Sequence, residues 1–136
     1  MRIDLDGAAA IFVFPARPSD ADIEIFLQKN IELLERNTAH ATIVDMSEVV
    51  QANPNQRKMA AAFVRENRAA LQRLRICTAF VVPSPLNRGI VTAVMWLQRP
   101  PYKFTLVPTL RDAQAWVTAT VQRASATPLS ASAGPR

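Results

Sequence analysis

Short apolar runs alternate four times with longer segments of helical periodicity along most of this chain. The runs occupy residues 8–14, 41–46, 76–82 and 104–107. Alternation of this kind is typical of an α/β domain with a largely parallel sheet, in which residues 41–46 and 76–82 would be neighbouring parallel strands. Function in such sheets collects in the crevice outside the carboxyl ends of the strands, so the pattern also indicates where a site would lie.

The residues before the first run predict an antiparallel lead-in. Ile3 and Leu5 alternate with polar neighbours, and Asp6-Gly7 then leads into residues 8–14. An Asp-Gly pair between alternating apolar residues favours a type I′ turn, because both central residues of that turn need positive φ. We therefore expect an edge strand at residues 2–5 that pairs antiparallel with residues 8–14.

Four helices are predicted between and after the strands. The expected ranges are 20–37, 54–74, Pro85 to about residue 99, and 110–124. The predicted caps are Ser19 or Asp20 for the first helix, Asn53 for the second and Ser84 for the third. Apolar residues at spacings of three and four predict one buried stripe on each helix. In the third helix this stripe is formed by Ile90, Val91, Val94, Met95 and Leu97. Trp96 and Trp116 are also predicted to be core residues.

These patterns predict a single α/β domain over residues 1–124. Its sheet is expected to be mixed and mostly parallel, with four to five strands, an antiparallel N-terminal edge hairpin and about four surrounding helices. Residues 125–136 contain only Ala, Ser, Thr, Pro, Gly, one Leu and a terminal Arg. Such a tail cannot bury enough apolar surface to offset the entropy lost on ordering, so the sequence predicts disorder there.

Composition narrows the class of protein. The chain has 136 residues, 49% of them hydrophobic, which is enough for the core of one globular domain. Cys77 is the only cysteine, so no internal disulfide can form, as is usual in a reducing cytosol. The N-terminal residues carry carboxylates where a signal peptide needs an apolar run, and no stretch approaches the length of a membrane span. We therefore expect a soluble cytoplasmic protein.

Three local patterns resemble a known family. Ile43-Val44-Asp45-Met46-Ser47 is similar to an apolar strand that ends in aspartate in the SpoIIAA-like (STAS-like) domains. Residues 79–82, together with Arg88-Gly89 and residues 92–97, resemble the third strand and helix of bacterial STAS/SEC14 domain proteins, and residues 112–116 resemble their final helix. The resemblance covers about residues 2–122. It implies a mixed sheet of four to five strands with helices, and a regulatory domain that binds other proteins.

The chain departs from this family at one functional position. In the anti-sigma factor antagonists of the family, a partner kinase phosphorylates a serine at the start of the helix that follows the aspartate-ended strand. Residues 49–55 read Val-Val-Gln-Ala-Asn-Pro-Asn, with no hydroxyl group, and Ser47 lies too early to take that position. The phosphorylation switch is therefore not expected, whereas binding of a protein partner stays open.

Polar residues follow the expected strands at their carboxyl ends. They are Asp45, Ser47, Asn53, Asn55, Ser84, Asn87 and Arg88, with Arg57 nearby at the start of the second helix. Helix starts expose amide donors, and Arg88 adds a cation one turn in, so this set suits a protein partner or an anion such as phosphate or carboxylate. In the competing interpretation, the Asn and Ser side chains only cap helices, and Arg88 pairs with Asp45 or a chain terminus.

The second helix carries basic residues on one side. Arg57, Lys58, Arg65 and Arg68 share a sector, whereas the first helix is acidic, and the whole chain has a formal charge of +5. A basic stripe can contact nucleic-acid phosphates or an acidic protein. However, no aromatic residues interleave for base stacking, so nucleic acid is the less favoured partner and a solvated charged face is the competing interpretation.

The residue types needed for catalysis are scarce. His40 is the only histidine and has no second His or Cys at ligand spacing, so no metal site is predicted. A nucleophile pair of Cys77 and His40 would need a buried thiol to reach across the sheet. The three glycines are too few for a phosphate-binding loop. We therefore expect no enzyme and no cofactor.

The sequence supports two functional hypotheses. The first is a non-catalytic regulatory or protein-interaction domain that acts near the start of the second helix. The alternative is a module that binds a small anionic or lipid ligand in an apolar pocket beside the sheet, gated by the third helix. The sequence leaves open whether the domain forms a homodimer.

Overall fold

A computed structural model describes residues 1–6, 9–50, 53–97 and 99–133 of the chain. Its sheet has five strands in the order β1-β2-β3-β4-β5. They are β1 (Arg2–Asp6), β2 (Ala9–Val13), β3 (His40–Asp45), β4 (Arg75–Val81) and β5 (Lys103–Val107). β1 pairs antiparallel with β2, and the other pairs are parallel. The mixed sheet and its antiparallel edge hairpin are thus confirmed, although the turn predicted at Asp6-Gly7 extends outside the described residues.

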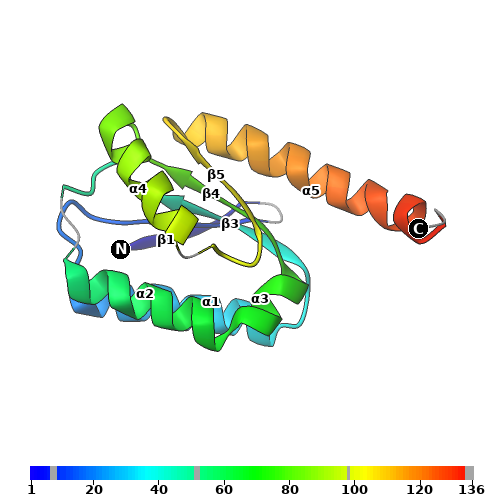
Figure 1. The fold of residues 1–136 in the computed structure, drawn as a ribbon, viewed down its shortest axis with the longest axis horizontal. Coiled ribbons are helices and arrows are strands. Elements are labelled where there is room, and N and C mark those ends of the chain that lie inside the picture. Colours follow the sequence, from blue (N-terminus) through cyan, green and yellow to red (C-terminus); the bar gives the residue numbers. More distant parts are fainter. Residues whose placement is uncertain (7–8, 51–52, 98, 134–136) are drawn as a thin grey trace.

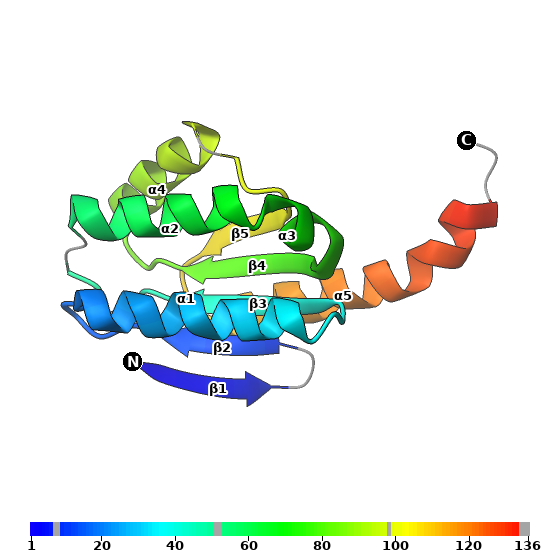
Figure 2. The same ribbon diagram turned by 90° about the horizontal axis from the view of Figure 1, so that it is seen from below.

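Helices cover both faces of the sheet. They are α1 (Asp20–Glu35), α2 (Pro54–Glu66), α3 (Arg68–Leu74), α4 (Pro85–Leu97) and α5 (Leu110–Ala133). Figures 1 and 2 show α1, α2 and α3 on one face and α5 on the other. α4 lies beside β5, at the end of the sheet away from β1 (Figure 2).

The alternation of side chains along the strands divides the core into two layers. Ile11, Ile43 and Ala79 are buried against Ala113 and Val117 of α5. The intervening strand residues point to the opposite face, where Phe12 and Val44 pack with apolar residues of α1. All six residues of β3 are buried, as expected for a central strand with both faces covered.

The helix starts follow the predicted capping chemistry. Ser19 forms a capping box with Asp22 at the start of α1. The Asn53 side chain accepts a hydrogen bond from the amide of Gln56, and Pro54 occupies the first helical position of α2. These caps place the N-terminal ends of α1 and α2 at the carboxyl edge of the sheet.

The predicted second helix, 54–74, is two helices in the structure. Asn67 interrupts it with φ −115° and ψ 19°, and its side-chain amide donates to the carbonyl of Phe63. Asparagine competes with helical hydrogen bonds in this way, because its short polar side chain reaches neighbouring backbone groups. The break lets α3 bury Leu71 and Leu74 against Leu34 of α1.

The last helix is longer than predicted. α5 continues to Ala133, whereas the sequence places its end near Ala124 and predicts disorder from residue 125 onward. The helix thus continues through Pro128 and a run of Ala and Ser residues, which nothing in the sequence pattern predicts. Figure 1 shows this part of α5 projecting beyond the sheet. Residues 134–136 lie outside the described residues, and a domain limit at residue 124 stays a prediction.

Candidate functional site

The carboxyl ends of the parallel strands meet at one edge of the sheet, as predicted. The amide of Met46, after β3, donates to the carbonyl of Val81 at 3.0 Å, and the amide of Val82, after β4, donates to Val107 at 2.8 Å. The loops that lead to α2 and α4 therefore begin side by side. They bring the starts of these two helices to the same edge.

Several residues predicted for a site at this edge cap helices. Asn53 accepts from the amide of Gln56 at 2.8 Å, and Ser84 accepts from the amide of Asn87 at 3.2 Å. The side-chain amide of Asn55 donates to the sulfur of Met59, one turn further along α2, at 3.7 Å. Arg57 lies exposed on the first turn of α2. The geometry gives Asn53, Asn55 and Ser84 local structural roles, and the role of all four residues in binding stays a prediction.

Arg88 holds the loop between β4 and α4. One of its guanidinium nitrogens donates to the carbonyls of Val82 and Pro83, at 2.8 Å each. The carboxylate of Asp45 instead accepts from the amide of Ser47 at 2.9 Å. The ion pairs of the described residues do not join Arg88 to Asp45 or to a chain terminus. The cation is thus held by strand-end carbonyls and stays half-exposed.

The outer side of α4 is exposed, which corrects the prediction that Ile90 and Trp96 belong to the core. Leu86, Ile90 and Trp96 are 73%, 55% and 66% exposed, and Gly89 and Ala93 between them are also exposed. We call these five residues the α4 surface. Arg88, Val91, Thr92 and Met95 form the half-buried inner side. α4 is apolar on nearly all sides, so periodicity alone could not show which side the sheet covers.

A buried arginine cluster, which sequence reasoning missed, lies at the other end of the sheet. Arg75 is 6% exposed and begins β4. Its Nε donates to Nε2 of His40 at 3.0 Å, one terminal nitrogen donates to the hydroxyls of Thr42 and Thr78 at 3.1 and 3.2 Å, and the other donates to the side-chain oxygen of Asn30 at 2.6 Å. The cation thereby joins α1, β3 and β4 through neutral acceptors.

Burial shifts the proton equilibria of this cluster. It lowers the pKa of Arg75 to about 10, and the guanidinium lies 5.5 Å from the centre of the Tyr102 ring. Burial also lowers the pKa of His40 below its ordinary 6.5, and the charge of Arg75 acts in the same direction. Nδ1 of His40 lies 3.0 Å from the carbonyl of Thr38. A neutral imidazole that donates to Thr38 and accepts from Arg75 fits both contacts.

The same geometry separates His40 from Cys77. Cys77 is fully buried on the face covered by α5, whereas His40 bonds to Arg75. Burial raises the pKa of the Cys77 thiol to about 11, so a thiolate is scarce at neutral pH. The two side chains therefore do not form a nucleophile and base pair. Within the described ranges, no three His, Cys, Asp or Glu side chains are grouped to hold a metal ion, and no helix is long and apolar enough to cross a membrane.

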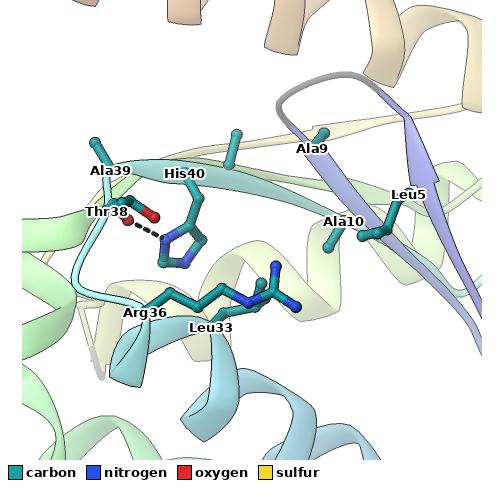
Figure 3. Close-up of a pocket in the computed structure, with 9 residues that line it drawn as sticks. Leu5, Ala9, Ala10, Leu33, Arg36, Thr38, Ala39 and His40 are labelled. Carbon is teal, nitrogen blue, oxygen red and sulfur yellow. Dashed lines mark hydrogen bonds between the residues drawn. The ribbon is translucent and has the colours of Figure 1, made fainter.

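A pocket of about 230 Å³ opens at the amino ends of β2 and β3, opposite the carboxyl edge. Its lining includes Leu5, Leu33, Arg36, Thr38 and His40 (Figure 3). No residue of α4 lines it, so the third predicted helix does not gate this pocket as expected.

Comparison with solved structures identifies the fold. A crystal structure of an uncharacterized protein of the DUF3478 family from Shewanella loihica PV-4, which has a SpoIIAA-like fold, superposes with a TM-score of 0.61 over 85% of this chain and 90% of that chain. This chain has the SpoIIAA-like fold. The sequence resemblance is therefore confirmed at the level of the fold. The two chains are 14% identical, and a likeness this distant shows the fold alone.

Comparison with sequences adds no function to the SpoIIAA-like fold. No protein-family model matches the chain, and no curated protein matches it.

Replacing the buried cation of this SpoIIAA-like domain should lower its stability. Arg75→Met leaves the acceptors of His40 and Asn30 without their donor, and each buried unsatisfied group costs about 1–3 kcal/mol. We expect the free energy of unfolding in urea to fall by about 2–4 kcal/mol. The control is Arg73→Met, which removes an exposed contact to Asn37 and should change stability by less than about 1 kcal/mol. Equal losses in the two variants would contradict a special role for Arg75.

Acidification should destabilise the fold through His40. Its folded pKa is below 6.5, so the unfolded chain takes up a proton first as the pH falls. Stability should therefore decrease as the pH drops through about 6.5 toward the folded pKa, before most carboxylates titrate. His40 is the only histidine, so its ring resonances in proton NMR give the folded pKa directly. His40→Gln should make the melting temperature nearly independent of pH between about pH 5.5 and 7. If the variant keeps the wild-type pH dependence, groups other than His40 are responsible for it.

The independence of Arg88 and Asp45 can be measured by a double-mutant cycle. Arg88→Ala removes two hydrogen bonds to strand-end carbonyls and should lower the free energy of unfolding by about 1–2 kcal/mol. Because Asp45 bonds to a different group, Asp45→Asn should add to this loss with a coupling below about 0.5 kcal/mol. A coupling above about 1 kcal/mol would mean that the two side chains do interact.

Proposed function

We propose that this chain is a non-catalytic regulatory domain that acts by binding another protein. The α4 surface carries this proposal. Large apolar side chains exposed singly are normal, but a helix that is apolar on almost every side is usually buried. Here three large side chains, two of them one turn apart, lie in water on the same side of one helix. Large apolar side chains gathered on one exposed side of a helix are typical of protein interfaces.

The position of α4 agrees with a binding role. The helix begins at the carboxyl edge of the sheet, where open α/β sheets collect their functional loops. Val50, in the loop before α2 at the same edge, is 70% exposed. The caps at Asn53 and Ser84 and the anchored Arg88 order the starts of α2 and α4, which would limit the entropy lost when a partner binds. The proposed surface thus extends from α4 toward the start of α2.

The buried polar groups support a non-catalytic role. The hydrogen-bonding nitrogens of His40 are engaged by Arg75 and Thr38, and the Cys77 thiol stays protonated at neutral pH. Histidine and cysteine are two of the side chains from which a general base or a nucleophile is commonly recruited.

The pocket at the amino ends of β2 and β3 supports a second candidate, a module that binds a small amphiphilic anion. Leu5 and Leu33 offer apolar contacts, and the cation of Arg36 lies beside them. Known ligand pockets measure roughly 300–1,000 Å³, so only a small molecule would fit. A small molecule retained in the native mass of the purified protein would favour this candidate, and an unliganded mass would favour protein binding.

Recovery of a partner from lysate of the native host tests the proposed function. The tagged wild-type chain should retain a protein that Ile90→Glu loses, because the carboxylate places an unpaired charge within the apolar interface. Ile25→Glu is the matched control, since Ile25 is a comparably exposed isoleucine, at 47%, on α1. Both variants should keep the wild-type melting temperature within a few degrees. A partner lost equally from both variants, or from neither, would contradict binding through α4.

A further inference from the structure

The arrangement of large and small residues on the α4 surface defines what shape can pack there. Leu86 and Ile90 are one turn apart, and Trp96 follows near the end of the helix. Gly89 and Ala93, also one turn apart, form a low strip beside them. Large side chains bordering a strip of small ones match the ridges and grooves by which two helices pack. The shape therefore favours a helix over an extended strand.

Gly89 has no structural reason to be a glycine within this chain. A Cβ added to it would meet nothing within 4 Å. An exposed glycine in a helix costs about 0.8–1 kcal/mol relative to alanine. This cost is explained if another backbone approaches α4 closely at this point, which only a residue without a side chain allows.

The charge beside the α4 surface defines the chemistry of the partner. The guanidinium of Arg99 lies 4.8 Å from the centre of the Trp96 ring, and Arg68 of α3 donates to the carbonyl of Arg99 at 3.1 Å. Neither arginine belongs to an ion pair of the described residues. Between residues 54 and 99 the sequence has eight basic residues and one acidic residue. Carboxylates opposite Arg68 and Arg99 would complement this charge.

The same charge argues against a second copy of α4 packed in parallel as the occupant. Parallel packing of two copies would bring each Arg99 close to the other. It would place like charges at the rim of an interface that has no acidic residue on α4 to offset them.

We propose that the α4 surface binds an amphipathic helix of another protein, whose apolar ridge packs over Gly89 and Ala93 and whose acidic residues face Arg68 and Arg99. This inference rests on the proposed function and adds the chemistry of the partner. A helix that binds in an apolar groove presents anchors spaced three and four residues apart.

Two synthetic helical peptides of about 18 residues test the proposal. Both peptides have the same apolar ridge of leucine and alanine. The residues that flank the ridge are glutamates in one peptide and lysines in the other. Titrated into the isotope-labelled full chain, the glutamate peptide should shift the NMR signals of α4 and change the fluorescence of Trp96. The lysine peptide should bind at least about tenfold more weakly, and the affinity of the glutamate peptide should fall as salt is raised from about 50 to 500 mM.

Variants separate the two parts of the proposed interface. Arg68→Glu with Arg99→Glu should reverse the preference between the peptides, whereas Arg73→Glu, away from the α4 surface, should not. Gly89→Leu should weaken binding of the glutamate peptide about tenfold or more while leaving the melting temperature unchanged or higher, because leucine is the better helix former and its Cβ meets nothing within 4 Å in the free chain.

Three results would overturn the proposal. They are equal binding of the two peptides, signal shifts centred away from α4, and self-association in sedimentation that Ile90→Glu abolishes, which would assign the surface to a second copy. One combination of results separates the two proposals. If wild type recovers a partner from lysate that Ile90→Glu loses, but the two peptides bind equally, the proposed function stands and only the acidic helix is refuted.

Discussion

The guanidinium of Arg75 is the contact on which the arrangement of α1 over the sheet depends. It reaches Asn30 on α1, His40 and Thr42 on β3, and Thr78 on its own strand. A buried cation is costly unless every donor finds an acceptor, so other placements of α1 that lose Asn30 are disfavoured. Apolar packing alone would tolerate small shifts of the helix, whereas this cluster specifies a single position and matches Thr42 with Thr78 across the two strands.

The polar contacts at the two ends of the sheet have different effects. Polar contacts at the amino end, around Arg75, are mostly internal and serve the fold. At the carboxyl end, the caps and Arg88 stabilise the loops, but the helix that starts there leaves its outer side uncovered. In this SpoIIAA-like domain, the buried polar cluster and the start of the proposed binding helix therefore lie at opposite ends of the same strands.

Local chemistry made much of the fold predictable, because strand periodicity, the antiparallel lead-in and the caps at Ser19 and Asn53 depend on near neighbours in sequence. Three features depend on the three-dimensional arrangement of the chain and could not be derived from the sequence pattern. Arg75 lies between a predicted helix and a predicted strand, and only the fold brings it to Asn30. The paired threonines in otherwise apolar strands were the available signal. The exposure of α4 depends on which side of the helix meets β5. The hydrogen bonds of Arg88, one of the predicted site residues, depend on the conformation of the loop between β4 and α4.

Tyr102 gives the molecule a built-in optical probe. It is the only tyrosine of the chain, and it packs against Leu34, Leu71 and Leu74 and beside the guanidinium of Arg75. Burial raises the pKa of its phenol above the ordinary 10. Its ionisation, followed by ultraviolet absorbance during an alkaline titration, therefore reports when the junction of α1, α3 and β5 opens to solvent. No label has to be introduced, and the signal is separate from that of the two tryptophans on α4 and α5.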